Sequence, residues 1–357
     1  MTLQMKIKRA MKKQNSQNNI DIKRDSYDYN LPKELIANSP AKPADSARLL
    51  IYNRATKEIE HTTFNRLLDY IPEGVDIFLN DTKVIKARIF GKKSSGGKVE
   101  LLIIKPLANS NFTVMIKGKV KVDTLLELDK GLIAKVQKLN IDGSREVKFY
   151  KDEKLLNFEE LIDILEDIGH IPLPPYINRE DRESDERDYQ TLFAKSAGSV
   201  AAPTASLHFT HKLLNELKSK FNTHFLTLHV GAGTFKSVEV DNILEHSMHS
   251  EYYSIPKESQ TVIDSEAKIL AVGTTATRTI EYYARVKKAS GECNLFLHPN
   301  NKPIRVDYLL TNFHLPKSTL IMLVSAFIGR DETLRVYNEA IKKRYRFYSY
   351  GDAMLIT

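Results

Sequence analysis

A change of hydrophobic pattern between residues 84 and 151 constrains the fold more than any other feature. Before residue 84 and after residue 151, apolar runs of strand length alternate with runs of helical period. Between them, short β-branched and apolar runs follow one another, separated by turn residues such as those at 94–97 and 142–143. Asp142-Gly143 is a strong hairpin signal, because tight hairpin turns need residues that tolerate positive φ. The sequence therefore predicts a small all-β module, a barrel or a sandwich.

The segments outside that module predict a layered structure. Alternating strands and helices are typical of α/β proteins, so we expect a mixed α/β fold. The expected strands of this part are 49–52, 77–79, 225–230, 269–272 and 308–311, its expected helices are 212–221, 277–286, 319–328 and 332–344, and the strands expected in the β module are 87–90, 98–104, 111–116, 131–136 and 145–150.

One further helix carries signals at both ends. Asn157 precedes Glu160 by three residues, which is the spacing of a capping box, and Gly169 follows the last apolar residue. The apolar residues between these signals share one helical face. We expect the charged stretch 179–188 that follows to be a solvated loop.

Length and cysteine content limit the classes of protein to consider. A chain of 357 residues can bury a core without disulfides or metals and is long enough for two domains. Cys293 is the only cysteine, which rules out an internal disulfide and a multi-cysteine zinc site and favours a reducing, cytoplasmic setting. No apolar run reaches the ~18 residues of a membrane-spanning helix, so we expect no membrane partner.

The N-terminal segment is unusually basic. Residues 1–25 hold seven Lys or Arg and two Asp, so they supply +5 of the net charge of +8 and leave +3 for the rest. Their polar composition predicts a disordered leader, and we attribute the high isoelectric point largely to it. Such a leader favours a polyanion such as RNA, or it is an over-extended start that Met5 or Met11 would replace.

Histidines concentrate in one part of the chain. Seven of the ten lie between residues 170 and 249, among small residues and prolines rather than long apolar side chains. Histidine changes charge near neutral pH, so this concentration indicates proton transfer or ligand contact. The seven are His170, His208, His211, His224, His229, His246 and His249.

Three expected strands end in small or polar residues, at 231–234, 273–275 and 312–314. Ligands of open α/β sheets lie beyond the carboxyl ends of strands, so these loops are expected to meet in one pocket. A fourth candidate is 80–82, which an Asx turn explains equally well. The alternatives for the three are a tight turn at the glycines, helix caps at Thr274 and Thr275, and a structural role for His314.

Other kinds of site have weaker support. His208-x-x-His211 and His246-x-x-His249, with Glu251 nearby, could hold a metal, but neither pair has the His-Glu-x-x-His pattern, and we expect no metal. The chain contains no Gly-x-Ser-x-Gly, and no Gly-x-Gly-x-x-Gly follows a strand. Near the C-terminus, cations alternate with aromatic residues, which suits phosphates and stacked bases or, equally, a solvated helix end; the cations are Lys342, Lys343, Arg344 and Arg346.

Taken together, these motifs resemble the S-adenosylmethionine:tRNA ribosyltransferase-isomerases of queuosine biosynthesis. The resemblance runs from about Tyr27 to Met354 and includes eight motifs in the same order, at 77–82, 169–177, 200–210, 226–235, 246–251, 272–275, 311–327 and 344–355. The departures are modest. Ser199 and Ser206 stand where the family usually has Ala and Gly, and residues 293–306 lack the usual Trp and Pro-Gly-Tyr turn.

The resemblance implies a fold and a reaction. A large α/β domain, here 26–83 plus 152–357, would carry an inserted β-barrel-like domain at 84–151. The enzyme would transfer and isomerise the ribosyl group of S-adenosylmethionine onto 7-aminomethyl-7-deazaguanine at the wobble position of tRNA. The products would be epoxyqueuosine-tRNA, adenine and methionine. S-adenosylmethionine would be a substrate, with no prosthetic group, and a monomer is expected although the sequence does not fix the oligomeric state.

The resemblance also suggests roles for residues. His229, His249 and Glu251 are expected to share the proton transfers that the acceptor amine, the carbon next to the sulfonium and the leaving adenine require. Arg278, with Thr274 and Thr275, would bind the methionine carboxylate, and Asp81 or Asp352 its ammonium group. The other candidate substrate-binding residues are His170, His208, Gly231, Gly233, Thr234, Asn312 and His314.

Two other functions compete with this one. A metal-dependent hydrolase would use the two His-x-x-His pairs and would contain stoichiometric zinc or iron. A non-catalytic RNA-binding module would use the β module and the basic C-terminal segment. Incubation with S-adenosylmethionine and modified tRNA separates the enzyme from the binding module, because only the enzyme releases adenine.

Overall fold

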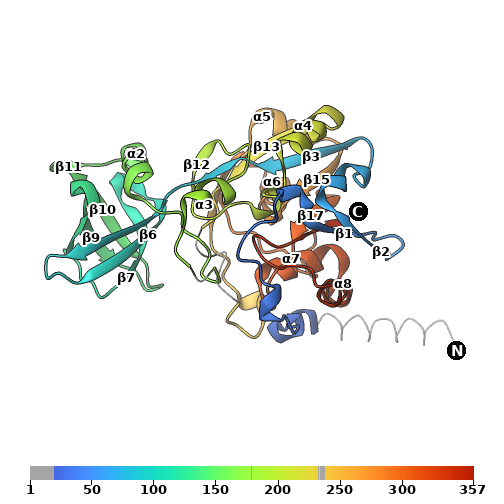
Figure 1. Ribbon diagram of the computed structural model, residues 1–357, viewed down its shortest axis with the longest axis horizontal. Coiled ribbons are helices and arrows are strands. Elements are labelled where there is room, and N and C mark those ends of the chain that lie inside the picture. Colours follow the sequence, from blue (N-terminus) through green and yellow to red (C-terminus); the bar gives the residue numbers. More distant parts are fainter. Residues whose placement is uncertain (1–19, 178, 232, 234–237) are drawn as a thin grey trace. The chain divides into compact units, whose positions relative to one another are not determined.

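A computed structural model describes residues 20–177, 179–231, 233 and 238–357 and is drawn in Figure 1. The described residues divide into two compact units, one within residues 20–80, 203–228 and 238–357 and one within residues 81–202 and 229–233. We call them the α/β unit and the barrel unit. The barrel unit continues past residue 151, where the sequence pattern placed the boundary, so the domain limits that we expected stay a prediction.

A nine-stranded mixed sheet forms the centre of the α/β unit. Its strand order is β16-β14-β13-β3-β15-β17-β18-β1-β2. The four strands β13, β3, β15 and β17 are parallel to one another, so their carboxyl ends lie at one edge. The strands are β1 (Arg48–Tyr52), β2 (Ile59–Thr63), β3 (Val75–Asn80), β13 (Thr223–Leu228), β14 (Glu251–Ser254), β15 (Lys268–Val272), β16 (Ser290–Cys293), β17 (Tyr308–Asn312) and β18 (Ala353–Ile356).

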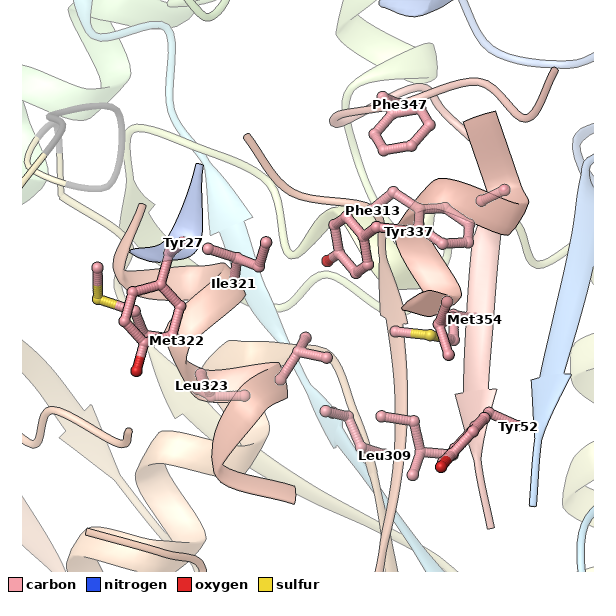
Figure 2. Close-up of a cluster of buried hydrophobic side chains, with 14 of the residues drawn as sticks. Tyr27, Tyr52, Leu309, Phe313, Ile321, Met322, Leu323, Tyr337, Phe347 and Met354 are labelled. Atoms are coloured by element: carbon pink, nitrogen blue, oxygen red, sulfur yellow. The ribbon is translucent and has the colours of Figure 1, made fainter. Parts of the chain in front are cut away.

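Five described helices belong to the α/β unit, namely α4 (His211–Lys220), α5 (Lys257–Ile263), α6 (Thr274–Val286), α7 (Thr319–Ile328) and α8 (Arg330–Lys342). The bounds of α7 agree with the sequence prediction, because Ser318 accepts a hydrogen bond from the Ile321 amide and caps the helix. Helix α7 is apolar on all sides since it is buried in the main core of the unit. Figure 2 shows Ile321 and Leu323 of α7 in that core with Leu309 and Met354 of the sheet.

Six strands of the barrel unit form a closed ring in the order β10-β7-β6-β5-β8-β9, because β9 also pairs with β10. Strand β11 pairs with β10 outside the ring. This confirms a mixed α/β protein that contains a small all-β barrel. The strands of this unit are β4 (Thr82–Val84), β5 (Arg88–Lys93), β6 (Lys98–Pro106), β7 (Phe112–Lys117), β8 (Leu125–Leu128), β9 (Ile133–Leu139), β10 (Arg145–Lys151), β11 (Lys154–Leu155) and β12 (Ser196–Ser199).

The helix predicted after the β module is α2 (Phe158–Ile168), and both halves of its capping box form between Asn157 and Glu160. Its apolar face packs on the barrel core. Gly169 has no room for a side chain, because an added Cβ would lie 2.1 Å from the Lys86 carbonyl oxygen.

The charged stretch 179–188 is not the fully solvated loop that we predicted. Residues Glu183–Asp188 form the short helix α3. Asp185 is buried there and accepts hydrogen bonds from the Arg179 guanidinium at 2.6 and 2.8 Å. Charge composition gives no sign that one carboxylate of such a stretch is buried in an ion pair, which explains the wrong prediction.

Residues 20–25, which we assigned to the disordered leader, have defined contacts. Asp21 is buried, and the Arg24 amide donates to the Asp241 carbonyl at 2.9 Å. The expected disorder therefore does not extend to these six residues. Within the part of the chain that the structure describes, every helix is too short or too polar to cross a membrane.

Candidate active site

Polar side chains of the α/β unit gather at the edge where the parallel strands end. Asn80 is the last residue of β3 and Asn312 the last of β17, while Gly273 follows β15 directly. All three are buried. The topology thus brings together residues that lie more than 200 positions apart in the sequence.

Asn80 connects the ends of β13 and β15. Its amide nitrogen donates to the Leu228 carbonyl at 3.0 Å and to the Thr275 hydroxyl at 3.1 Å, and its oxygen accepts from the Leu228 amide. Helix α6 begins at Thr274, so Gly273 is the cap residue instead of either threonine. Gly273 has φ +92°, a conformation that favours glycine.

Asn312 holds a second set of polar groups. Its side-chain oxygen accepts from the Thr204 hydroxyl at 3.1 Å, and its nitrogen donates to Nε2 of His208 at 3.1 Å. Because that ring nitrogen accepts, the proton of the neutral imidazole is on Nδ1. Burial, with the charge of Arg346 adding to it, lowers the pKa of His208 to about 3. His208 is therefore a neutral, oriented imidazole at neutral pH.

Asp352 lies at the same edge, one residue before β18, beside Asn312. Its carboxylate accepts from the backbone amides of Arg48 at 3.0 Å and Arg346 at 2.7 Å. The carboxylate thus fixes the turn that carries Arg346. The expected contact between Asp352 and the methionine ammonium group stays a hypothesis. It requires that a carboxylate oxygen of Asp352 either give up one of these backbone bonds or accept a second hydrogen bond.

His314 is buried two residues after β17. Its Nε2 lies 2.9 Å from the Thr311 hydroxyl, and its backbone amide donates to the Tyr337 hydroxyl. Burial lowers the pKa of His314 to about 3. These contacts fit the structural role that was our alternative, and contact of His314 with a substrate stays a prediction.

Glu251 and Arg278, which we expected to act separately, form a buried ion pair with each other. The guanidinium also donates to the carbonyls of Leu295 at 3.1 Å and Cys293 at 3.4 Å. Burial opposes the charge on Arg278, but the charges of Glu251 and Cys293 outweigh it and raise the pKa of Arg278. A substrate carboxylate at Arg278 would have to replace or share Glu251.

His229 is held within the barrel unit. Its Nδ1 lies 2.8 Å from the Thr82 hydroxyl, and burial lowers its pKa although the charge of Asp81 acts against the shift. The ring fills the space beside Gly198, where an added Cβ would lie 2.9 Å from Nε2. Gly198 also has φ +147°, so both its backbone conformation and the lack of space for a Cβ require glycine. The lowered pKa means that the imidazole is neutral at neutral pH.

The remaining candidates from the sequence are exposed, lie in the barrel unit or lie outside the described residues. His170 is partly exposed, and its Nδ1 lies 3.0 Å from the Asp181 carboxylate in the barrel unit. His249 is exposed in the α/β unit. Gly231 and Gly233 belong to the barrel unit, and Thr234 lies outside the described residues. That all three loops share one pocket therefore stays a prediction.

The basic C-terminal candidates lie at and after the end of α8. Lys342, Lys343 and Arg344 are exposed. Arg346 is partly buried and lies 3.5 Å from the Asp352 carboxylate. We call the polar residues at the carboxyl ends of the strands the strand-end cluster, namely Asn80, Thr204, His208, Thr274, Thr275, Asn312 and Asp352. The basic segment therefore ends next to this cluster, at Arg346.

Neither His-x-x-His pair forms part of a metal cluster in the described residues, where no three His, Cys, Asp or Glu side chains are arranged to hold an ion. The sequence interpretation missed Thr204, Gly198 and the buried Ser206 hydroxyl, which has no hydrogen-bond partner within the described structure. Thr204 and Ser206 lie in the family motif at 200–210 and Gly198 lies just before it, but the local sequence gave no signal for these roles.

Comparisons with known proteins all point to the same family. A family model described as queuosine biosynthesis protein matches residues 24–356. A protein of Aliarcobacter butzleri named S-adenosylmethionine:tRNA ribosyltransferase-isomerase is 62% identical over 94% of this chain and 98% of its own length. One of Nitratiruptor sp. with the same name is 64% identical over the same shares. The crystal structure of an S-adenosylmethionine tRNA ribosyltransferase from Thermotoga maritima is also similar, with 34% identity, a TM-score of 0.52, and coverage of 93% of this chain and all of that chain.

Proposed function

The chain belongs to the queuosine biosynthesis family of S-adenosylmethionine:tRNA ribosyltransferase-isomerases, and from this premise we propose how its own residues serve the reaction. It transfers and isomerises the ribosyl group of S-adenosylmethionine onto 7-aminomethyl-7-deazaguanine at the wobble position of tRNA. Epoxyqueuosine-tRNA, adenine and methionine are the products. The observation that carries this function is near-identical length combined with about three-fifths identity to relatives of that name.

His229 is our candidate for the base. The acceptor amine must lose a proton before it can attack, and a neutral imidazole can take it. Burial lowers the pKa of His229, so its neutral form predominates at physiological pH. Thr82 orients the ring through Nδ1, and we propose Nε2 as the nitrogen that transfers the proton.

The strand-end cluster of the α/β unit is our candidate for binding S-adenosylmethionine. Thr274, Thr275, Asn312 and His208 supply hydroxyl, amide and imidazole groups at one edge. The Nδ1 proton of His208 suits an acceptor on the nucleoside. We keep Arg278 and Glu251 in the site as one ion pair, and Asp81, His170, His249, His314, Asp352, Gly231, Gly233 and Thr234 as candidates that mutation must test.

The partners follow from the reaction. We propose that Lys342, Lys343, Arg344 and Arg346 contact tRNA phosphates. We propose that the enzyme has no prosthetic group, because S-adenosylmethionine is consumed as a substrate. We also propose a cytoplasmic location, because the tRNA substrate is found there, and a monomeric state.

Release of adenine tests the function. Purified protein is incubated with S-adenosylmethionine and tRNA that carries 7-aminomethyl-7-deazaguanine, and adenine is measured by chromatography. We expect one adenine for each modified tRNA, and none with tRNA that carries guanine at the wobble position. Equal release with both tRNAs, or release of S-adenosylhomocysteine instead, would contradict the proposal.

A further inference from the structure

The positive charge of the folded protein is concentrated in the barrel. Residues 84–155 hold sixteen Lys or Arg and eight Asp or Glu, a net charge of +8 that equals the charge of the whole chain. Residues 1–25 carry +5, so all the other residues together carry −5. Our interpretation that the leader accounts for most of the charge was therefore incomplete. The barrel needs its own explanation.

Strand register gathers lysines at one end of the barrel. Lys92 on β5 is directly opposite Lys98 on β6, an arrangement that costs stability because like charges face each other. The turn between these strands brings Lys93 close to the next connection, where its Nζ donates to the Lys119 carbonyl at 3.0 Å. We call Lys92, Lys93, Lys98, Lys117, Lys119 and Lys121 the lysine end.

Glycines let the two connections approach each other. Gly118 has φ +134°, and an added Cβ would lie 3.2 Å from Val99 on β6. This close contact places Lys117 and Lys119 beside the start of β6, where Lys98 lies. Gly96 has φ +83° in the β5–β6 turn, so its backbone also requires glycine.

Acidic side chains only partly neutralise the lysine end. Glu127 lies 3.3 Å from Lys92, and Glu100 lies 3.7 Å from Lys117. The side chains of these two lysines are nevertheless 62% and 84% exposed. Asp123 pairs with Lys135 instead, at 3.0 Å. Two carboxylates beside six lysines leave a positively charged surface.

We propose that the lysine end binds the phosphate backbone of the substrate tRNA. The identity of the RNA rests on the proposed function, but the affinity for a polyanion rests on the charge alone. Several lysines on fixed strands and tight turns can each neutralise a phosphate and release its counterions. Lysine ammonium groups carry no base pattern, so this surface positions the RNA and leaves recognition of the nucleoside to the strand ends.

A triple variant tests the proposal in the full-length protein. K98Q/K117Q/K119Q removes three charges from the lysine end, and K130Q/K151Q/K154Q removes three from the connections at the far ends of β8 and β10. For the first variant we expect a Kd for modified tRNA at least about tenfold higher at 0.15 M salt, with a salt dependence smaller by about two units in log K against log [salt]. The control should change Kd less than threefold.

The remaining measurements separate this proposal from its alternatives. Adenine release at saturating tRNA should stay within twofold of the wild type in the first variant. A Kd and a salt dependence like those of the wild type would overturn the proposal, and so would equal losses in both variants. Val122 and Ile141 are exposed near this end, so preferential binding to phosphatidylserine vesicles over tRNA would also overturn it. Loss of tRNA affinity without any adenine release in the wild type would instead support the surface and refute the proposed function.

Discussion

The strand-end cluster of the α/β unit and the lysine end of the barrel use polar residues in opposite ways. In the first, Asn312 bonds to both His208 and Thr204, and the bond to His208 is fully buried while that to Thr204 is partly buried. In the second, Lys92 and Lys98 face each other in solvent without enough acidic residues nearby. The first region is ordered before any ligand arrives, whereas the second needs an anion from outside. Mutations in the cluster should act on stability and chemistry, and mutations at the lysine end on salt-dependent binding.

The largest effect should come from His229, a partly buried, neutral histidine of the barrel unit. For His229→Ala we expect at least a hundredfold slower single-turnover ribosyl transfer, since removal of a general base typically costs 10²–10⁴-fold. The affinity for tRNA should stay within threefold. Thr82→Val, which removes only the bond to Nδ1, should cost about tenfold. A loss under tenfold for His229→Ala would refute its role as the base.

Asn312 tests whether the strand-end cluster is ordered by its own bonds. Asn312→Ala leaves the Thr204 hydroxyl and Nε2 of His208 without their partner, so we expect unfolding free energy to fall by about 2 kcal/mol. Urea unfolding measures this change, and it should be the same in 0.05 and 0.3 M salt. Thr204→Val removes one of the two bonds and should cost about half as much. A cost that shrinks with salt would remove the contrast with the lysine end.

Local sequence predicted the elements whose signals are local. The Asn157–Glu160 capping box and the apolar run of α7 gave helices at the expected positions. Strands β8, β14 and β16 were missed because they are short and alternate with charged or small residues, so only their pairing reveals them. The same limit applies to helix α3, which a buried ion pair supports.

The sequence predicted only those site residues that directly follow a recognisable strand. Asn312 and Thr275 were candidates because ligands gather beyond parallel strands, and both lie at that edge. The pairing of Glu251 with Arg278 could not be foreseen, since β14 must first lie beside β16. Gly198 was missed because the need for glycine there depends on the position of the His229 ring, which the sequence does not give.

Acidification should weaken the α/β unit through its buried histidines. Burial lowers the pKa of both His208 and His314 to about 3, against an ordinary value near 6.5. The unfolded chain therefore binds more protons between these values, and stability, complete above pH 6.5, falls as the pH drops through this range. Each histidine should cost about 1 kcal/mol between pH 7 and 5.5. The urea midpoint of His314→Gln should fall less over this interval than that of the wild type, and parallel profiles would contradict the expectation.

The smallest effect should appear where the barrel carries like charges without a ligand. Lys148 on β10 is directly opposite Lys135 on β9, so the ladder contains a repulsion that the pairing of Lys135 with Asp123 reduces only in part. Lys148→Glu replaces it with an attraction, and we expect the barrel to gain about 0.5 kcal/mol in low salt. Lys148→Gln, which only removes the repulsion, should gain about half of that, and both gains should fade at 0.5 M salt as the charges are screened. Thermal unfolding measures both variants. Destabilisation by Lys148→Glu would mean that the lysines of the barrel are already neutralised within the protein, and the contrast between the two regions would then lose its physical basis.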